Sequence, residues 1–188
     1  MLYRFCRGLL KLIFATLFPL RTVGLDNIPA TGPALLCSNH ISNIDPTTVG
    51  VKVRRKVHYM AKSELFSFKP AGKFLRSLGA FPVNRGGVSK ESIRTALKLL
   101  KDGHVMGIFP EGTRGSGGAA KKGAAMIALR SGAPVIPVRI IGSYRPFRRL
   151  TIVYGKPIDL TEVAASAAPD MLEQATEVIM KEIHSLSA

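Results

Sequence analysis

Short apolar runs alternate with helix-like stretches along most of this chain, and this alternation restricts the fold more than any other feature. Each run is short enough for a buried strand and is bounded by glycine, proline or polar residues. The expected strands lie within residues 23–29, 33–37, 57–61, 79–83, 105–109, 134–141 and 150–154. Helices are expected at about 46–53, 90–101, 121–130 and 170–186, with a basic amphipathic segment at 69–78. This order predicts a single α/β domain with a mixed, largely parallel central sheet flanked by helices.

Reactive side chains follow the ends of several expected strands. Because ligands of parallel α/β sheets gather where strands end in loops, residues in these positions are candidates for one common site. The candidates are His40, Lys62, Arg85 and the segment Glu111–Arg114. For each of them the alternative is an ordinary exposed residue of a surface loop.

The strongest local candidate is the pair His40 and Asp45, which follows the strand expected at 33–37. A histidine near neutral pH can take a proton from a hydroxyl, and a carboxylate on its other ring nitrogen fixes the tautomer and stabilises the imidazolium. A spacing of five does not match one helix face, so the pair can meet only at an irregular turn or a helix start. The alternative is a solvated His40 and an Asp45 that caps the next helix.

A polar, glycine-rich loop follows the strand expected at 105–109 and places Glu111, Gly112, Thr113 and Arg114 side by side. An arginine fork can bind two phosphate oxygens, and backbone amides beside glycine can add donors. The P-loop pattern is absent, so this is a different kind of phosphate-binding candidate.

The formal net charge of +15 indicates an anionic partner: nucleic acid, an anionic membrane surface or a phosphorylated molecule. Aromatic residues are not interleaved with the basic ones as base-stacking platforms would be, which disfavours nucleic acid. The apolar content of 46% favours contact with lipid. Two cysteines are too few for a disulfide framework, so a reducing, cytosolic location is expected. The histidines form no metal-ligand spacing with His40, which disfavours a metal hydrolase.

Residues 1–22 are expected to form an N-terminal amphipathic helix, followed by a second region over 23–188. Arg4, Arg7 and Lys11 fall on one helical stripe, and most large apolar residues fall elsewhere. Lys11 in mid-span would cost a membrane-spanning helix about 2.5–3.5 kcal/mol. We therefore expect a helix in the membrane interface, with its apolar side down and its cations toward lipid headgroups. The alternative is a helix docked on the core with a solvated basic stripe.

Four sequence blocks occur together in an order and spacing that resemble one known family. The blocks are Asn39-His40-x4-Asp45, Phe81-Pro82-Val83-Asn84-Arg85, Phe109-Pro110-Glu111-Gly112-Thr113-Arg114 and Val135-Ile136-Pro137-Val138. The chain resembles the glycerolipid acyltransferases over about residues 23–157, most closely the bacterial 1-acylglycerol-3-phosphate acyltransferases. It departs from the family at Gly115, where serine is usual, and about 22 residues before the resemblance leave room for one helix.

The resemblance implies transfer of a fatty acyl group from a thioester, acyl-ACP (acyl carrier protein) or acyl-CoA, to the free hydroxyl of lysophosphatidate. By family pattern His40 is the general base and Asp45 orients it, with no cofactor beyond the co-substrate. The positions that match the phosphate-binding set are Lys62, Arg85, Thr113 and Arg114, with Glu111 and Gly112 shaping the loop. The expected location is the cytoplasmic face of the cell membrane, as a peripheral or monotopic protein. Glycerol-3-phosphate or another lysophospholipid as acceptor, and a non-catalytic module that binds anionic lipid or nucleic acid, remain the alternatives.

Overall fold

A computed structural model of the chain describes residues 1–83, 89–111, 119–166 and 168–188. Seven strands in these ranges form one sheet in the order β1-β7-β6-β2-β5-β3-β4. The strands are β1 Leu20–Val23, β2 Ala34–Ser38, β3 Val57–Lys62, β4 Ala80–Val83, β5 Val105–Ile108, β6 Val135–Ile141 and β7 Leu150–Tyr154. Neighbouring strands are parallel except for the antiparallel pair β6 and β7. The expected mixed, largely parallel sheet is confirmed.

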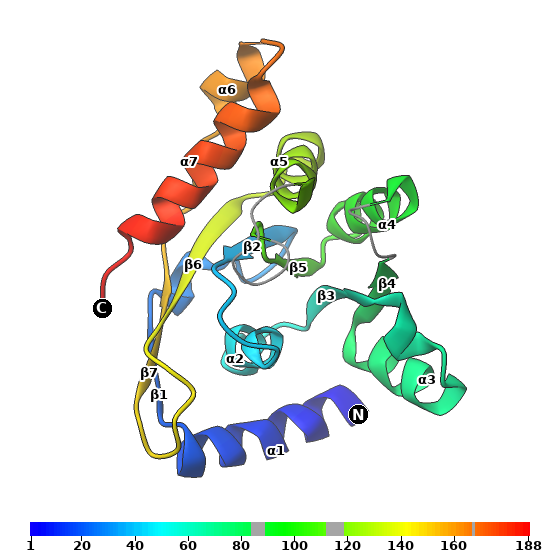
Figure 1. Ribbon diagram of the computed structural model, residues 1–188, viewed down its shortest axis with the longest axis vertical. Helices are drawn as coiled ribbons and strands as arrows, with labels where there is room; N and C mark the ends of the chain where they lie inside the picture. Colours follow the sequence, from blue (N-terminus) through cyan, green and yellow to red (C-terminus); the bar gives the residue numbers. More distant parts are fainter. Residues whose placement is uncertain (84–88, 112–118, 167) are drawn as a thin grey trace.

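Helices cover both faces of the sheet (Figure 1). They are α1 Leu2–Leu17, α2 Asp45–Val51, α3 Lys69–Leu78, α4 Lys90–Lys101, α5 Ala119–Ser131, α6 Thr161–Ala165 and α7 Met171–Ser185, with short 3-10 helices η1 Leu25–Asn27 and η2 Ser63–Phe66. Helices α4, α5 and α7 lie on one face, and α2 lies on the other with α1 beyond it. The sequence did not predict α6.

Strand β2 lies in the middle of the sheet, and every one of its residues is buried. Its side chains alternate between the two faces, as the pleat of a strand requires. Leu35 and Cys37 pack with α4, α5 and α7, whereas Ala34 and Leu36 pack with α2. Two apolar layers therefore hold β2 in place, and its carboxyl end carries the candidate residue His40.

The first strand lies earlier than expected, at Leu20–Val23 and not within 23–29. These residues pair with Leu150–Val153 of β7 at the edge of the sheet. Gly24 ends the strand with a left-handed φ of 74°, and a Cβ there would collide with the Tyr154 carbonyl oxygen. The position of β1 is thus set by a partner strand distant in sequence, which local pattern does not reveal.

Helix α1 forms as expected, but part of its basic stripe faces the protein. Arg7 donates to the carbonyl oxygens of Val53 and Arg54, at 2.8 and 2.9 Å, just past the end of α2. Partial desolvation and the nearby charges of Arg7 and Lys52 lower the pKa of Lys11. The expectation that these cations point to headgroups is therefore wrong for Arg7, because its side chain donates to backbone carbonyl groups of the segment that follows α2. No helix in the described part of the chain is long and apolar enough to cross a membrane.

Candidate active site

His40 and Asp45 meet at the start of α2, just past the carboxyl end of β2. His40 Nδ1 lies 2.7 Å from Asp45 Oδ2. Asp45 is fully buried, whereas the His40 side chain is 15% exposed. An ionised Asp45 accepts this bond, so Nδ1 carries the proton and Nε2 remains the proton acceptor. The contact between the two residues is confirmed; their catalytic roles remain predictions.

The Asp45 carboxylate is held by donors on both oxygens. Oδ2 accepts from the backbone N–H groups of Ile41 and Ser42, at 2.6 and 2.8 Å. Oδ1 accepts from the Tyr144 hydroxyl at 2.7 Å. These bonds compensate for burying a charge and point its oxygens back toward His40. The alternative of a helix-capping Asp45 is wrong, because the carboxylate makes no cap bond to α2.

Tyr144 is a functional candidate that the sequence reasoning missed. It lies in the loop between β6 and β7, 99 residues from Asp45. Its hydroxyl also lies 2.8 Å from Thr48 Oγ1, and its ring meets the edge of Phe18. Burial, followed by the hydrogen bond to Asp45, raises the pKa of Tyr144 far above its ordinary value. Tyr144 therefore stays protonated and remains a donor. No periodic or local pattern marks such a contact.

The imidazole of His40 packs against a stack of aromatic rings. Its ring lies 4.4 Å from that of Phe109 with an interplanar angle of 23°, and Phe109 in turn lies 6.1 Å from Tyr59. Gly107 makes room for this stack, since a Cβ there would collide with the Tyr59 ring. Burial raises the pKa of Tyr59 well above its ordinary value, so its ring stays neutral. The stack holds the plane of the imidazole.

Asn39 supports the turn that carries His40. Its side-chain amide donates to the Ile140 carbonyl at 3.0 Å and accepts from the Ile140 N–H at 2.8 Å. The side chain thereby replaces a strand partner for β6 where β2 ends. The chain can then leave the sheet at His40 without leaving buried backbone groups unpaired.

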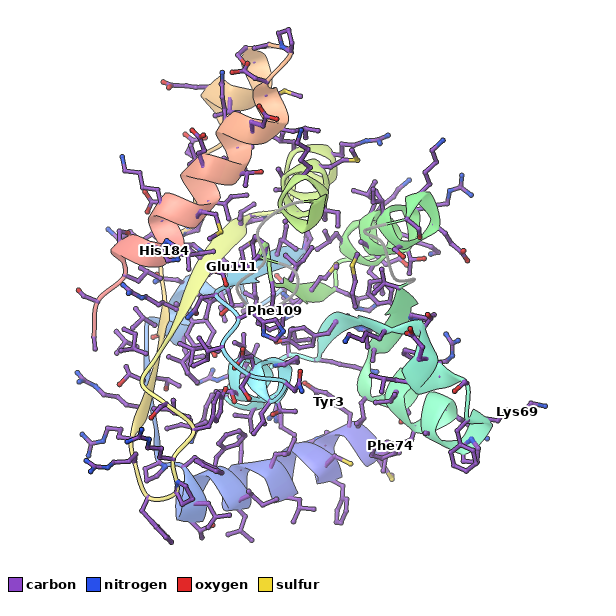
Figure 2. The ribbon with its side chains drawn as sticks, in the orientation of Figure 1. Tyr3, Lys69, Phe74, Phe109, Glu111 and His184 are labelled. Carbon is purple, nitrogen blue, oxygen red and sulfur yellow. The ribbon has the colours of Figure 1, made fainter. Side chains whose placement is uncertain are left out.

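The predicted phosphate-binding residues lie only partly within the described ranges. Arg85, Gly112, Thr113 and Arg114 lie outside them. Lys62 is the last residue of β3 and is exposed. Glu111 is partly buried, and its Oε1 lies 3.7 Å from Nε2 of His184 on α7 (Figure 2).

The strands that lead to these residues share one edge with His40. Strands β2, β5, β3 and β4 are consecutive and parallel, so their carboxyl ends lie at the same edge of the sheet. The expected common placement at strand ends is confirmed for His40, Lys62 and Glu111. Of these described groups, the partly exposed His40 imidazole and the exposed Lys62 are open to a bound molecule, whereas the Asp45 carboxylate lies buried behind the imidazole.

Comparison with known proteins defines the class. Residues 19–141 match the acyltransferase family model, and the chain belongs to this family. It is 34% identical over 192 residues to the 1-acyl-sn-glycerol-3-phosphate acyltransferase of Bacillus subtilis (strain 168), covering 98% of this chain and 96% of the relative. The enzyme of the same name from Streptococcus pneumoniae is 29% identical over 172 residues, covering 87% of this chain and 65% of the relative. The crystal structure of the 1-acyl-sn-glycerophosphate (LPA) acyltransferase PlsC from Thermotoga maritima has the same fold, with a TM-score of 0.69 and 22% identity over 100% of this chain and 80% of that one.

Proposed function

We propose that this chain transfers a fatty acyl group from an acyl thioester to the sn-2 hydroxyl of 1-acylglycerol-3-phosphate, giving phosphatidic acid. Membership of the acyltransferase family and identity to a 1-acyl-sn-glycerol-3-phosphate acyltransferase along nearly the whole chain support this activity. The observation that carries the mechanism is the imidazole of His40 held at 2.7 Å by the buried Asp45.

The reaction needs a base but no nucleophilic side chain. His40 Nε2 takes the proton of the lipid hydroxyl as its oxygen attacks the thioester carbonyl carbon. Asp45 stabilises the imidazolium that forms, and the Phe109 ring keeps the imidazole in its plane. The carbon–sulfur bond then breaks, and the imidazolium returns the proton to the thiolate. Acyl groups and protons balance, and the base is regenerated.

The acceptor phosphate is placed by cations at the same edge of the sheet. In this proposal Arg85, Thr113 and Arg114 bind the phosphate with Lys62, while Glu111 and Gly112 shape the loop. The order of the parallel strands supports such a cluster, because these segments follow β3, β4 and β5, whose carboxyl ends lie at the same edge of the sheet as His40. Acyl-ACP and acyl-CoA are both anionic, and the net charge of +15 suits either donor.

The proposed location is the cytoplasmic face of the cell membrane, reached through α1. The outward face of this helix leaves large apolar side chains exposed: Leu2, Phe5, Leu9, Leu12, Ile13 and Leu17. An exposed apolar face of this length is typical of a helix that lies in a membrane interface. The acceptor and the product are lipids, so this placement brings the protein to both.

The test is an acyl-transfer assay with purified protein, in which lysophosphatidate is offered with acyl-ACP or acyl-CoA and the product is identified by mass. We expect phosphatidic acid from at least one donor, and a loss of about 10²–10⁴-fold in the His40→Ala variant. Glycerol-3-phosphate and other lysophospholipids are offered in parallel. Full activity of folded His40→Ala would contradict the mechanism, and preference for another acceptor would contradict the substrate.

A further inference from the structure

The loop between β6 and β7, residues 142–149, holds an aromatic side chain out in solvent. Phe147 is 75% exposed. It has a φ of 63° and is the only residue other than glycine with a positive φ among those described. A bulky residue adopts this conformation at a cost, so the surrounding structure must impose it. The backbone N–H of Phe147 donates to the carbonyl oxygen of Leu17 at 2.6 Å, which ties the loop to the end of α1.

Three cations lie within two residues of Phe147 in the same loop. Arg145, Arg148 and Arg149 are all exposed, and none of them has an acidic partner within the described ranges. Unpaired arginines beside an exposed aromatic ring match an anionic lipid surface, which attracts cations close to the headgroups. A protein partner would need an acidic surface around an apolar pocket.

The loop lies close to the exposed apolar residues of α1. It turns beside the C-terminal end of that helix, at the lower left of Figure 1. The nearest exposed apolar residues along α1 are Leu17 and Ile13. Phe147 therefore adds an exposed aromatic side chain beside the end of α1, where exposed apolar residues also lie.

We propose that the β6–β7 loop is a second membrane contact, which inserts Phe147 into the interface of an anionic phospholipid bilayer while Arg145, Arg148 and Arg149 bind headgroup phosphates. This inference extends the membrane placement of the proposed function. It also gives the surface a direct connection to the site, because Tyr144 in the same loop holds the Asp45 carboxylate. A bilayer that fixes the loop would thus also fix the catalytic carboxylate.

The chain contains no tryptophan, so a Phe147→Trp variant carries a single fluorescent reporter. With phosphatidylglycerol-containing vesicles we expect its emission to shift to the blue and to be quenched by brominated acyl chains. The control is Glu177→Trp on α7, an exposed position on the opposite side of the sheet, where the same vesicles should leave emission unchanged. Protein that sediments with vesicles while the Phe147→Trp emission stays unchanged would overturn the proposal. Blue-shifted emission without vesicles, together with dimeric elution, would also overturn it by assigning the loop to a subunit interface.

A second variant tests the contribution of the ring to affinity. Phe147→Ser should bind these vesicles about tenfold more weakly than the native chain, because the variant has no phenyl group to transfer from water into the bilayer. The ring is exposed, so the unfolding transition should be preserved, and circular dichroism checks this. Unchanged vesicle affinity would refute the loop contact. Neither measurement uses an acyl donor, so failure of acyl transfer and failure of this inference are separate results.

Discussion

Tyr144 is positioned to influence His40, the proposed base, through the Asp45 carboxylate. Its hydroxyl disperses the negative charge of Asp45 by donating to Oδ1. In Tyr144→Phe the carboxylate loses this donor, becomes more negative and favours the imidazolium of His40. Because only the neutral imidazole accepts a proton, the acid limb of the kcat/KM profile should move to higher pH. We also expect kcat to fall about tenfold.

Tyr154→Phe is the matched control for this experiment. The Tyr154 hydroxyl is also buried and donates to the Val49 carbonyl at 2.7 Å, but it does not contact Asp45. The Tyr154→Phe substitution should lower the free energy of unfolding and leave the pH dependence of kcat/KM unchanged. A Tyr144→Phe enzyme with the native pH profile would show that Tyr144 serves packing only.

His58 is expected to make stability depend on pH. Burial, with the charges of Lys56 and His104, lowers its pKa from 6.5 to about 4. The unfolded chain therefore binds a proton at this residue at higher pH than the folded chain does. Stability should fall as the pH is lowered from about 6.5 to about 4. Denaturant midpoints measured across this pH range should fall less in His58→Gln than in the native chain. Equal falls in the two proteins would show that His58 does not cause the pH dependence of stability.

Among the elements, the contact between β5 and β3 is sensitive to a small change, because Gly107 lies against the Tyr59 ring. In Gly107→Ala the new methyl group would collide with that ring, and the stack that ends at His40 would have to shift. We expect a loss of about 1–3 kcal/mol in the free energy of unfolding, measured by denaturant titration. Acyl transfer should fall as well.

The control is Gly8→Ala in α1, where a Cβ would meet no atom within 4 Å. Alanine favours a helix interior over glycine, so this variant should gain about 0.5–1 kcal/mol. If the two substitutions had the same effect on stability, the collision at Gly107 would not be real.

The elements that sequence predicted best are those whose signals are local. The apolar run before His40 and the proline after Asp45 lie within one short segment. The strand, the helix and the contact between His40 and Asp45 could therefore all be predicted. The contacts of Tyr144 with Asp45 and of β1 with β7 join residues far apart in sequence. Such contacts leave no local periodicity. The direction of Arg7 also depended on a partner, the carbonyl groups after α2, that only the packed structure supplies.

At the scale of the whole molecule, the net charge of +15 should also attract the anionic acyl donor. Raising the ionic strength from about 0.1 M to about 1 M shortens the Debye length from about 10 Å to about 3 Å. The KM for the donor should therefore rise with salt, whereas kcat at saturating donor should change little, because the His40–Asp45 pair is mostly shielded from solvent. Initial rates with lysophosphatidate in neutral detergent micelles measure this without an anionic bilayer. A donor KM that is independent of salt would mean that the basic surface attracts lipid alone.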